Sequence, residues 1–160
     1  MRRKTQFLTH GALIAALYVV LTYLCNMLGL ANGVIQVRFS EALTILPMFT
    51  SAAIPGLFAG CLVSNLLTGA ALWDIVFGSL ATLLGAVGTY YFGKNSYLAA
   101  VFPIAANSII IPFVLKFAYG VSEGFWFIFG TVFAGELISC GILGVMLAKA
   151  IDKTKLFKIQ

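Results

Sequence analysis

The sequence predicts an all-α integral membrane protein, a single domain built as a bundle of six transmembrane helices. Its 160 residues are 61% hydrophobic and 9% charged, with a mean hydropathy of +1.04, whereas soluble domains carry about 25% charged residues. The apolar residues form long runs, and runs of about 20 residues are typical of bilayer-spanning helices. The lysines and arginines also gather on one side of the predicted spans.

The first predicted span covers about residues 7–28. The basic start "MRRK" resembles that of a signal peptide. However, the apolar run from Phe7 to Leu30 is longer than the 7–15 residues of a signal-peptide core, and no A-x-A cleavage site follows it. We therefore interpret the run as a membrane helix that ends at "GLANG".

The other spans are expected between turn-forming stretches such as "AAIPG", "TGAALWD", "GKNS" and "GVSEG". The second and third spans are short for a hydrocarbon core about 30 Å thick, which leaves open whether one of them bends or crosses incompletely. The expected ranges are 34–53, 56–69, 74–92, 97–119 and 125–151.

The distribution of basic residues predicts the orientation in the cell membrane. Six spans put both termini on one side, and cytoplasmic loops carry an excess of lysine and arginine. We therefore expect both termini to be cytoplasmic. The basic residues sit mainly at the chain ends, so the net charge of +5 does not indicate a nucleic-acid partner. The inner set is Arg2, Arg3, Lys4, Lys94, Lys149, Lys153, Lys155 and Lys158, and the outer set is Arg38 and Lys116.

Polar residues in several predicted spans converge on one outward-facing region. A charged side chain at bilayer depth is costly, so it marks function or a buried pair. Glu136 stands about halfway along the last span and has no lysine or arginine at helical spacing, which favours a functional role. The other candidates for ligand binding are Asn107, Asp74, Glu41, Arg38, Trp73 and Asn65.

Each of these other candidates also has a structural interpretation, which the sequence leaves open. The alternatives are an i,i+3 ion pair between Arg38 and Glu41, a helix cap at Asp74, interhelical hydrogen bonds from Asn65 and Asn107, and an interfacial position for Trp73.

Several motifs are absent or incomplete. "GTYYFGKN" nearly matches a phosphate-binding loop, but Asn95 replaces the required Ser or Thr and the segment ends a helix instead of following a strand. We therefore expect no nucleotide site. Cys25, Cys61 and Cys140 are widely spaced and fit no metal or disulfide pattern, so we interpret them as small core residues. No arrangement of histidine, cysteine, serine or lysine indicates an enzyme, and no cofactor is expected.

Small residues four apart occur in the first and third spans. Such pairs allow helices to approach closely and could also dock a partner helix. The pairs are Ala12/Ala16, Gly11/Ala15 and Gly56/Gly60.

Four stretches together resemble the QueT family of substrate-binding S components of energy-coupling-factor (ECF) transporters. They are "QVRFSEALTILP", "IPGLFAGCLVSNLLTG", "DIVFGSLATLLGA" and "GELI", and they extend over nearly the whole chain. The family pattern falls on Arg38, Ser40, Glu41, Asn65, Asp74, Gly135 and Glu136.

The resemblance implies a six-helix S component that binds a queuosine precursor from outside. It also implies partners: a transmembrane coupling protein and two cytoplasmic ATPases that supply the energy. Family members often contact the coupling protein through an A-x-x-x-A motif near the inner end of the first helix, which falls here on Ala12 and Ala16.

The implied ligand, preQ1 or a related deazaguanine, has a guanine edge with two adjacent N–H donors and a cationic aminomethyl arm. Glu136 could accept from the ring edge, and Asn107 or Asn65 could donate to the ring carbonyl. Glu41 or Asp74 could hold the ammonium group, although these assignments could permute. Arg38 could hold Glu41 in position, and Trp73 could lie over the ring.

Three rival interpretations remain at this point. The protein could be an S component for another vitamin-like or nucleobase-like ligand, a membrane-embedded enzyme that uses Glu136 as acid or base, or a structural subunit. An enzyme should carry a second catalytic group at similar depth, and a structural subunit would not need several unpaired polar groups on one side.

Overall fold

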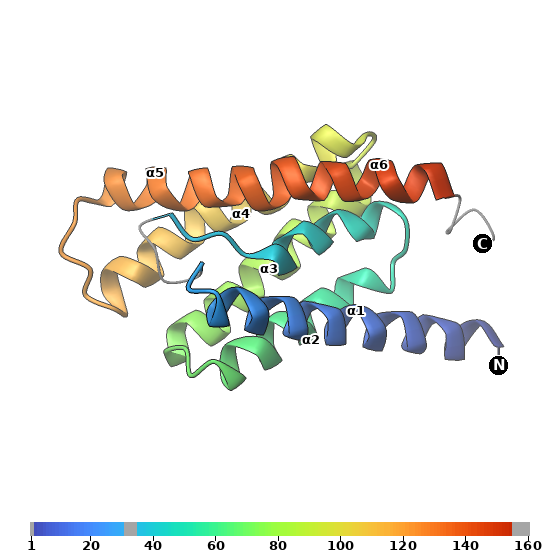
Figure 1. Cartoon of the computed structure of the whole chain (residues 1–160), viewed down its shortest axis with the longest axis horizontal. Helices are drawn as coiled ribbons and strands as arrows, with labels where there is room; N and C mark the ends of the chain where they lie inside the picture. Colours follow the sequence, from blue (N-terminus) through green and yellow to red (C-terminus); the bar gives the residue numbers. More distant parts are fainter. Residues whose placement is uncertain (1, 31–34, 155–160) are drawn as a thin grey trace.

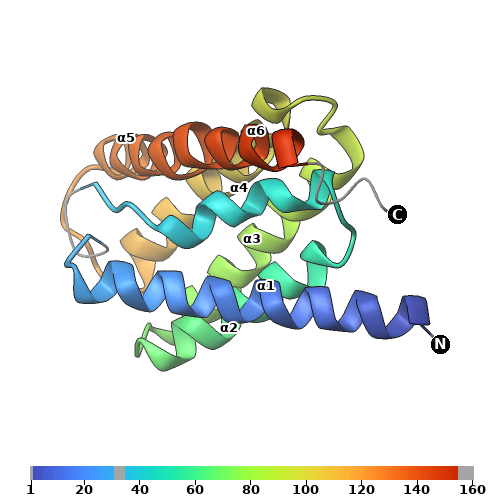
Figure 2. The same cartoon turned by 45° about the vertical axis from the view of Figure 1, so that its right-hand side comes forward.

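The computed structural model describes residues 2–30 and 35–154, and over these residues the chain folds into helices joined by turns and short irregular segments. The helices run back and forth, so that the start of α1 and the end of α6 lie at the same end of the bundle (Figures 1 and 2). The elements are α1 (Arg2–Met27), η1 (Phe39–Met48), α2 (Ala53–Leu67), α3 (Leu72–Phe92), α4 (Ser96–Phe117), α5 (Phe125–Glu136), η2 (Leu137–Gly144) and α6 (Val145–Thr154).

Four of these helices are long and apolar enough to cross a bilayer. They are Arg3–Met27, Leu72–Phe92, Ser96–Phe117 and the continuous rod Phe125–Thr154 formed by α5, η2 and α6. With the shorter η1 and α2, the described residues make six helical rods. This confirms the predicted all-α fold, and the four long apolar helices agree with the predicted membrane protein.

The described part of the second predicted span, 34–53, is not the continuous helix that we expected. Val34 lies outside the described residues, residues 35–38 are irregular, and the helix that follows is a 3₁₀ helix of 10 residues. The Thr44 hydroxyl donates to the carbonyl oxygen of Glu41 (2.6 Å), which an α-helix would use for the N–H of Ile45. Pro47 has no N–H to donate. These local features oppose the α-helix that the hydrophobic run suggested.

Two helices begin before the expected spans. α2 begins at Ala53, before the expected start at residue 56, because Pro55 is tolerated in the first turn, where its missing N–H has no intrahelical partner. α1 begins at Arg2, five residues before the expected start at Phe7. The basic residues there belong to the helix, which extends past the apolar run.

The last rod is not a uniform α-helix. Its middle part, η2, is a π-helix, a form that is rare and frequently found at functional sites. Gly144 of η2 lies so close to η1 that a Cβ there would be 3.4 Å from the carbonyl oxygen of Ala42. The hydroxyl of Ser139, also in η2, accepts a hydrogen bond from the backbone N–H of Arg38 (3.1 Å).

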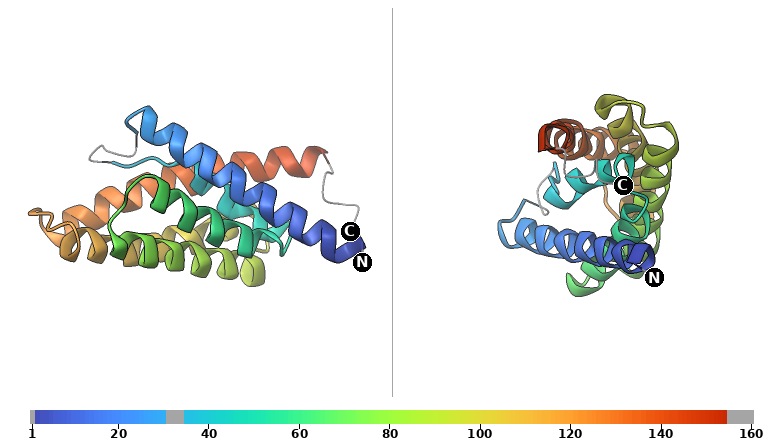
Figure 3. Two further views of the ribbon diagram at one scale, coloured as in Figure 1. Left: turned by 90° about the horizontal axis from the view of Figure 1, so that it is seen from below. Right: turned by 90° about the vertical axis from the view of Figure 1, so that its right-hand side faces the viewer.

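η1 passes through the centre of the bundle, surrounded by the other helices (Figure 3). Every residue from Ser40 to Pro47 is buried. Leu43 and Leu46 pack with α1 and α2 in one apolar cluster, and Ile45 packs with α4, η2 and α6 in a second. The apolar core therefore surrounds the C-terminal part of η1, while its first residues reach a polar region.

Candidate ligand-binding site

A small polar cavity, the inner chamber, lies where the start of η1 meets α4 and α5. Its volume is about 40 Å³. Three of the predicted site residues, Glu41, Asn107 and Glu136, meet here from three different elements, and Arg38 borders it. The lining residues are Gln36, Arg38, Glu41, Cys61, Gly78, Thr82, Asn107, Ile111, Leu115, Thr131, Val132 and Glu136.

Both side-chain oxygens of Glu41 have donors within the protein. The hydroxyl of Tyr18, a fully buried residue of α1, donates to Oε1, and Asn107 donates to Oε2 (3.5 Å). Glu41 itself is 2% exposed. The carboxylate is therefore held by hydrogen bonds from α1 and α4, two partners that the sequence did not indicate.

Glu136 lies beside Glu41 and is held by a different group. The thiol of Cys140, one turn further along the same rod, donates to Glu136 Oε2 (3.2 Å) and contacts the carbonyl oxygen of Glu41 (3.4 Å). One side-chain oxygen of each glutamate and the sulfur of Cys140 lie within 4.8 Å of one another. The inner chamber thus contains two closely spaced carboxylates.

The same three atoms are near enough to serve as ligands of one metal ion. Cysteine binds a metal ion as the thiolate, so a metal here would have to displace the thiol proton and the contacts of Cys140 with the neighbouring oxygens. Two adjacent carboxylates suit an organic cation without any such change.

A larger cavity, the outer cavity, adjoins the inner chamber and has a volume of about 420 Å³. The two cavities share the lining residues Gln36, Arg38, Ile111 and Leu115. The outer cavity also reaches the α2–α3 turn and the residues after α4, and is therefore nearer that end of the bundle. Its further lining residues are Thr22, Asn26, Asn65, Thr68, Gly69, Ala70, Asp74, Tyr119 and Val121.

Asp74 and Asn65 belong to this outer cavity. Asn65 donates to the backbone carbonyl of Asp74 (3.4 Å), so it links α2 to the start of α3. Tyr119 accepts from the N–H of Ala71 (3.0 Å) and donates to Asp74 Oδ2 (3.3 Å). Burial, together with the adjacent Asp74 carboxylate, raises the pKa of Tyr119, so its hydroxyl stays protonated as a donor.

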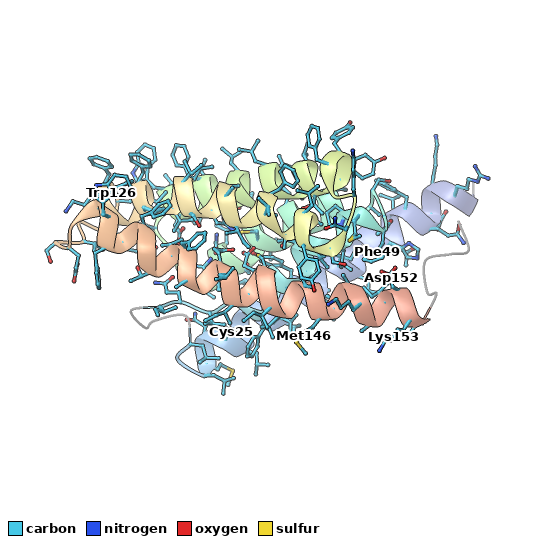
Figure 4. All side chains as sticks on the ribbon, turned by 90° about the horizontal axis from the view of Figure 1, so that it is seen from above. Cys25, Phe49, Trp126, Met146, Asp152 and Lys153 are labelled. Carbon is cyan, nitrogen blue, oxygen red and sulfur yellow. The ribbon has the colours of Figure 1, made fainter. Side chains whose placement is uncertain are left out.

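Trp73 does not belong to either cavity. Its side chain is 60% exposed and stacks on Phe77, and it lines an apolar groove between α3 and α4 on the outside of the bundle. Aromatic side chains project outward from this side of the protein (Figure 4). The structure therefore does not bring Trp73 to the other site residues.

Sequence reasoning missed several residues of the site. Tyr18 and Tyr119 had no signal, because a tyrosine in a membrane helix or at its end is unremarkable. Cys140 lies four residues after Glu136, a helical spacing that could have indicated contact. All three cysteines are buried and unpaired, as predicted for core residues, but Cys140 also contacts both glutamates.

A model of the QueT transporter family matches residues 8–153. This chain belongs to the QueT transporter family. A similar curated protein is "Queuosine precursor transporter QueT" of Lactococcus lactis subsp. cremoris, 36% identical over 84 residues. The match covers 52% of this chain and 48% of that relative, about half of its length. No solved structure matches. A transporter family agrees with the prediction that the protein is not an enzyme.

Two further residues of the QueT pattern hold the site together. The hydroxyl of Ser40 is fully buried and accepts from Thr22 of α1 (2.8 Å). Gly135 lies directly against the carbonyl oxygen of Gln36, and a side chain there would collide with it. Residues 35–38, the last part of the α1–η1 connection, can therefore lie across α5 beside both cavities.

The small residues of α1 divide between two faces in this QueT protein. Gly11 and Ala15 face α2, where a Cβ on Gly56 would be 2.6 Å from the carbonyl oxygen of Gly11. Ala12 and Ala16 are exposed. The first pair is an internal helix contact, and the second pair is available to another protein or to lipid.

Proposed function

We propose that this protein is the membrane-embedded substrate-binding subunit for uptake of a queuosine precursor, preQ1 or a related deazaguanine. A separate ECF module, consisting of a coupling protein and two ATPases, supplies the energy. The protein spans the cell membrane six times with both termini in the cytoplasm. Membership in the QueT family and the name of the Lactococcus relative, a queuosine precursor transporter, support the substrate class.

The observation that carries the proposal is the pair of adjacent carboxylates, Glu41 and Glu136, inside the bundle. Ionised groups at this depth are costly unless they are paired or serve a ligand. A deazaguanine offers several N–H donors and, in preQ1, one cationic arm. These are the partners that Glu41, Glu136 and Asp74 would accept.

The proposed partner surface is the exposed face of α1 that contains Ala12 and Ala16. Small side chains let the backbones of two membrane helices approach closely. The face lies in the N-terminal half of α1, on the same end of the bundle as the end of α6 (Figure 1). Both are on the cytoplasmic side in the proposed orientation, where the ATPases would be.

The substrate class is tested by mass spectrometry of small molecules that co-purify with the detergent-extracted protein, followed by calorimetric titration with preQ1. We expect a deazaguanine in the purified sample. Recovery of an unrelated vitamin-like compound, with no binding of preQ1, would contradict the proposal.

The role of the inner chamber is tested by Glu136→Gln. Charge-assisted hydrogen bonds contribute about 1.5–3 kcal/mol each, so we expect preQ1 binding to weaken at least about a hundredfold, roughly 2.7 kcal/mol. Glu123→Gln is the matched control, because Glu123 is exposed in the α4–α5 connection. Wild-type affinity in Glu136→Gln would exclude a ligand role, and a large loss of stability without ligand would favour a structural role.

A further inference from the structure

The two cavities differ enough in size to define which part of a ligand each accepts. A cavity needs about 10–15 Å³ to hold one water molecule. The inner chamber, at about 40 Å³, therefore has room for only a few non-hydrogen atoms. The outer cavity, at about 420 Å³, lies in the range of ordinary small-molecule sites.

The two cavities also differ in the number of carboxylates in their linings. Among the described lining residues, the inner chamber contains two carboxylates, Glu41 and Glu136, and the outer cavity contains one, Asp74. Arg38 borders both and is the single basic residue in either lining. Acidic groups are thus in excess, and they are closest together where the space is smallest.

A planar heterocycle cannot enter the inner chamber as it stands, but a short arm ending in an ammonium group can. From these dimensions and charges we infer that the proposed deazaguanine binds with its short primary-amine arm pointing inward. The ammonium lies between Glu41 and Glu136, and the ring occupies the outer cavity. This inference rests on the proposed function and reverses the expectation that Glu136 reads the ring edge.

The groups around each end of the ligand support this orientation. Glu41 is fixed by Tyr18 and Asn107, so it presents its remaining lone pairs in a defined direction. Asp74 is fixed at Oδ2 by Tyr119 and can still accept from two adjacent N–H groups of a guanine-type edge. Ile111 and Leu115, which line both cavities, supply an apolar surface for the ring.

The test compares two ligands that differ in charge and hardly in shape, 7-aminomethyl- and 7-hydroxymethyl-7-deazaguanine. We expect the wild-type protein to prefer the amine by at least about thirtyfold in calorimetric titration. Glu136→Gln should remove this preference by weakening the amine and leave hydroxymethyl binding within about threefold of wild type. Binding of the hydroxymethyl ligand also shows that the variant is folded. Glu41→Gln is a second variant that tests the same preference for the amine.

Asp74→Asn is the matched control in the outer cavity. It should weaken both ligands by a similar factor and leave the preference for the amine intact. The orientation is wrong if Asp74→Asn abolishes the preference, or if Glu136→Gln weakens both ligands equally. Failure of the wild-type protein to bind either deazaguanine would instead refute the proposed function, and the inference with it.

Discussion

Two faces of α1 carry the same kind of residue and meet different surroundings. Gly11 and Ala15 are packed against Gly56 and Gly60 of α2, whereas Ala12 and Ala16, one position further along, are exposed. Small residues four apart permit close helix contact on either face. The difference shows that this pattern indicates where a helix can approach, and only the fold shows which approach is already used.

The packed face is also connected to the ligand site. Tyr18 continues the same face one turn after Ala15, and its Cβ would be 2.7 Å from a Cβ placed on Gly60. Its hydroxyl donates to Glu41. The position of α1 against α2 therefore determines the position of a site carboxylate, while the exposed face has no such connection through Ala12 or Ala16.

The strongest test of this difference is Gly60→Leu. The new side chain would collide with Tyr18 and with Ala15, whose Cα would be 3.1 Å from the added Cβ. Overpacking of this kind costs about 1–3 kcal/mol or more. We expect the melting temperature to fall by at least about 5 °C, with ligand binding lost as Tyr18 moves.

Gly130→Leu is its matched control, because a Cβ on Gly130 meets no atom within 4 Å. It should leave the melting temperature and ligand binding unchanged. Equal loss of stability in both variants would show that a glycine-to-leucine change destabilises any helix of this protein, and that the effect does not come from the α1–α2 contact.

The double substitution Ala12→Leu and Ala16→Leu tests the exposed face. We expect uptake in cells and co-purification with the ECF module to be lost, because the larger side chains hold a partner helix away. Ligand affinity of the isolated protein should stay unchanged. Ala105→Leu, at an exposed position of α4, should retain uptake. Lost ligand binding with intact assembly would reverse the roles of the two faces.

Tyr18→Phe separates the packing of this residue from its hydrogen bond. The ring still fills the space beside Gly60, but Glu41 loses one of its two donors. Hydrogen bonds to charged groups contribute about 1.5–3 kcal/mol, so we expect preQ1 affinity to fall by about tenfold. Tyr23→Phe, which changes an exposed tyrosine on the same helix, should bind normally. Unchanged affinity in Tyr18→Phe would show that Glu41 needs no help from α1.

The smallest functional effect is expected from a cysteine at Lys94, which tests whether the exposed face of α1 lies toward the cytoplasm. Lys94 is exposed in the α3–α4 turn, and Glu123 is exposed in the α4–α5 connection at the opposite end. The native cysteines of the chain are buried. A membrane-impermeant thiol reagent should label Glu123→Cys in intact cells and Lys94→Cys only after permeabilisation. The reverse pattern would place the α1 face outside.

Much of the fold follows from the sequence, because hydrophobic runs and turn residues determine where long membrane helices begin and end. α3 and α4 lie within two residues of their expected ranges. η1 was beyond this reasoning. Its burial on every side and its contact with Cys140, about a hundred residues away, depend on distant parts of the chain, which one segment alone does not reveal.

The sequence predicted which residues form the site better than it predicted how they are arranged. The cost of burying charge singled out Glu136 and Glu41, and the structure places them together. Reasoning from the sequence could not reveal that Tyr18 and Asn107 hold Glu41, since these contacts join residues 23 and 66 positions apart. The separation of Asp74 from the inner chamber depends on cavity shape, which emerges only once six rods are packed.

The irregular segment before η1 and the 3₁₀ helix itself have a consequence for biogenesis. Backbone of this kind leaves peptide groups without helical partners, and it is tolerated at membrane depth only when protein surrounds it. η1 also has only 10 residues, too few for independent insertion as a transmembrane helix. Because η1 packs against α4, η2 and α6 as well as against α1 and α2, we expect this part of the nascent chain to remain at the translocation channel until the C-terminal helices have been made and can enclose it.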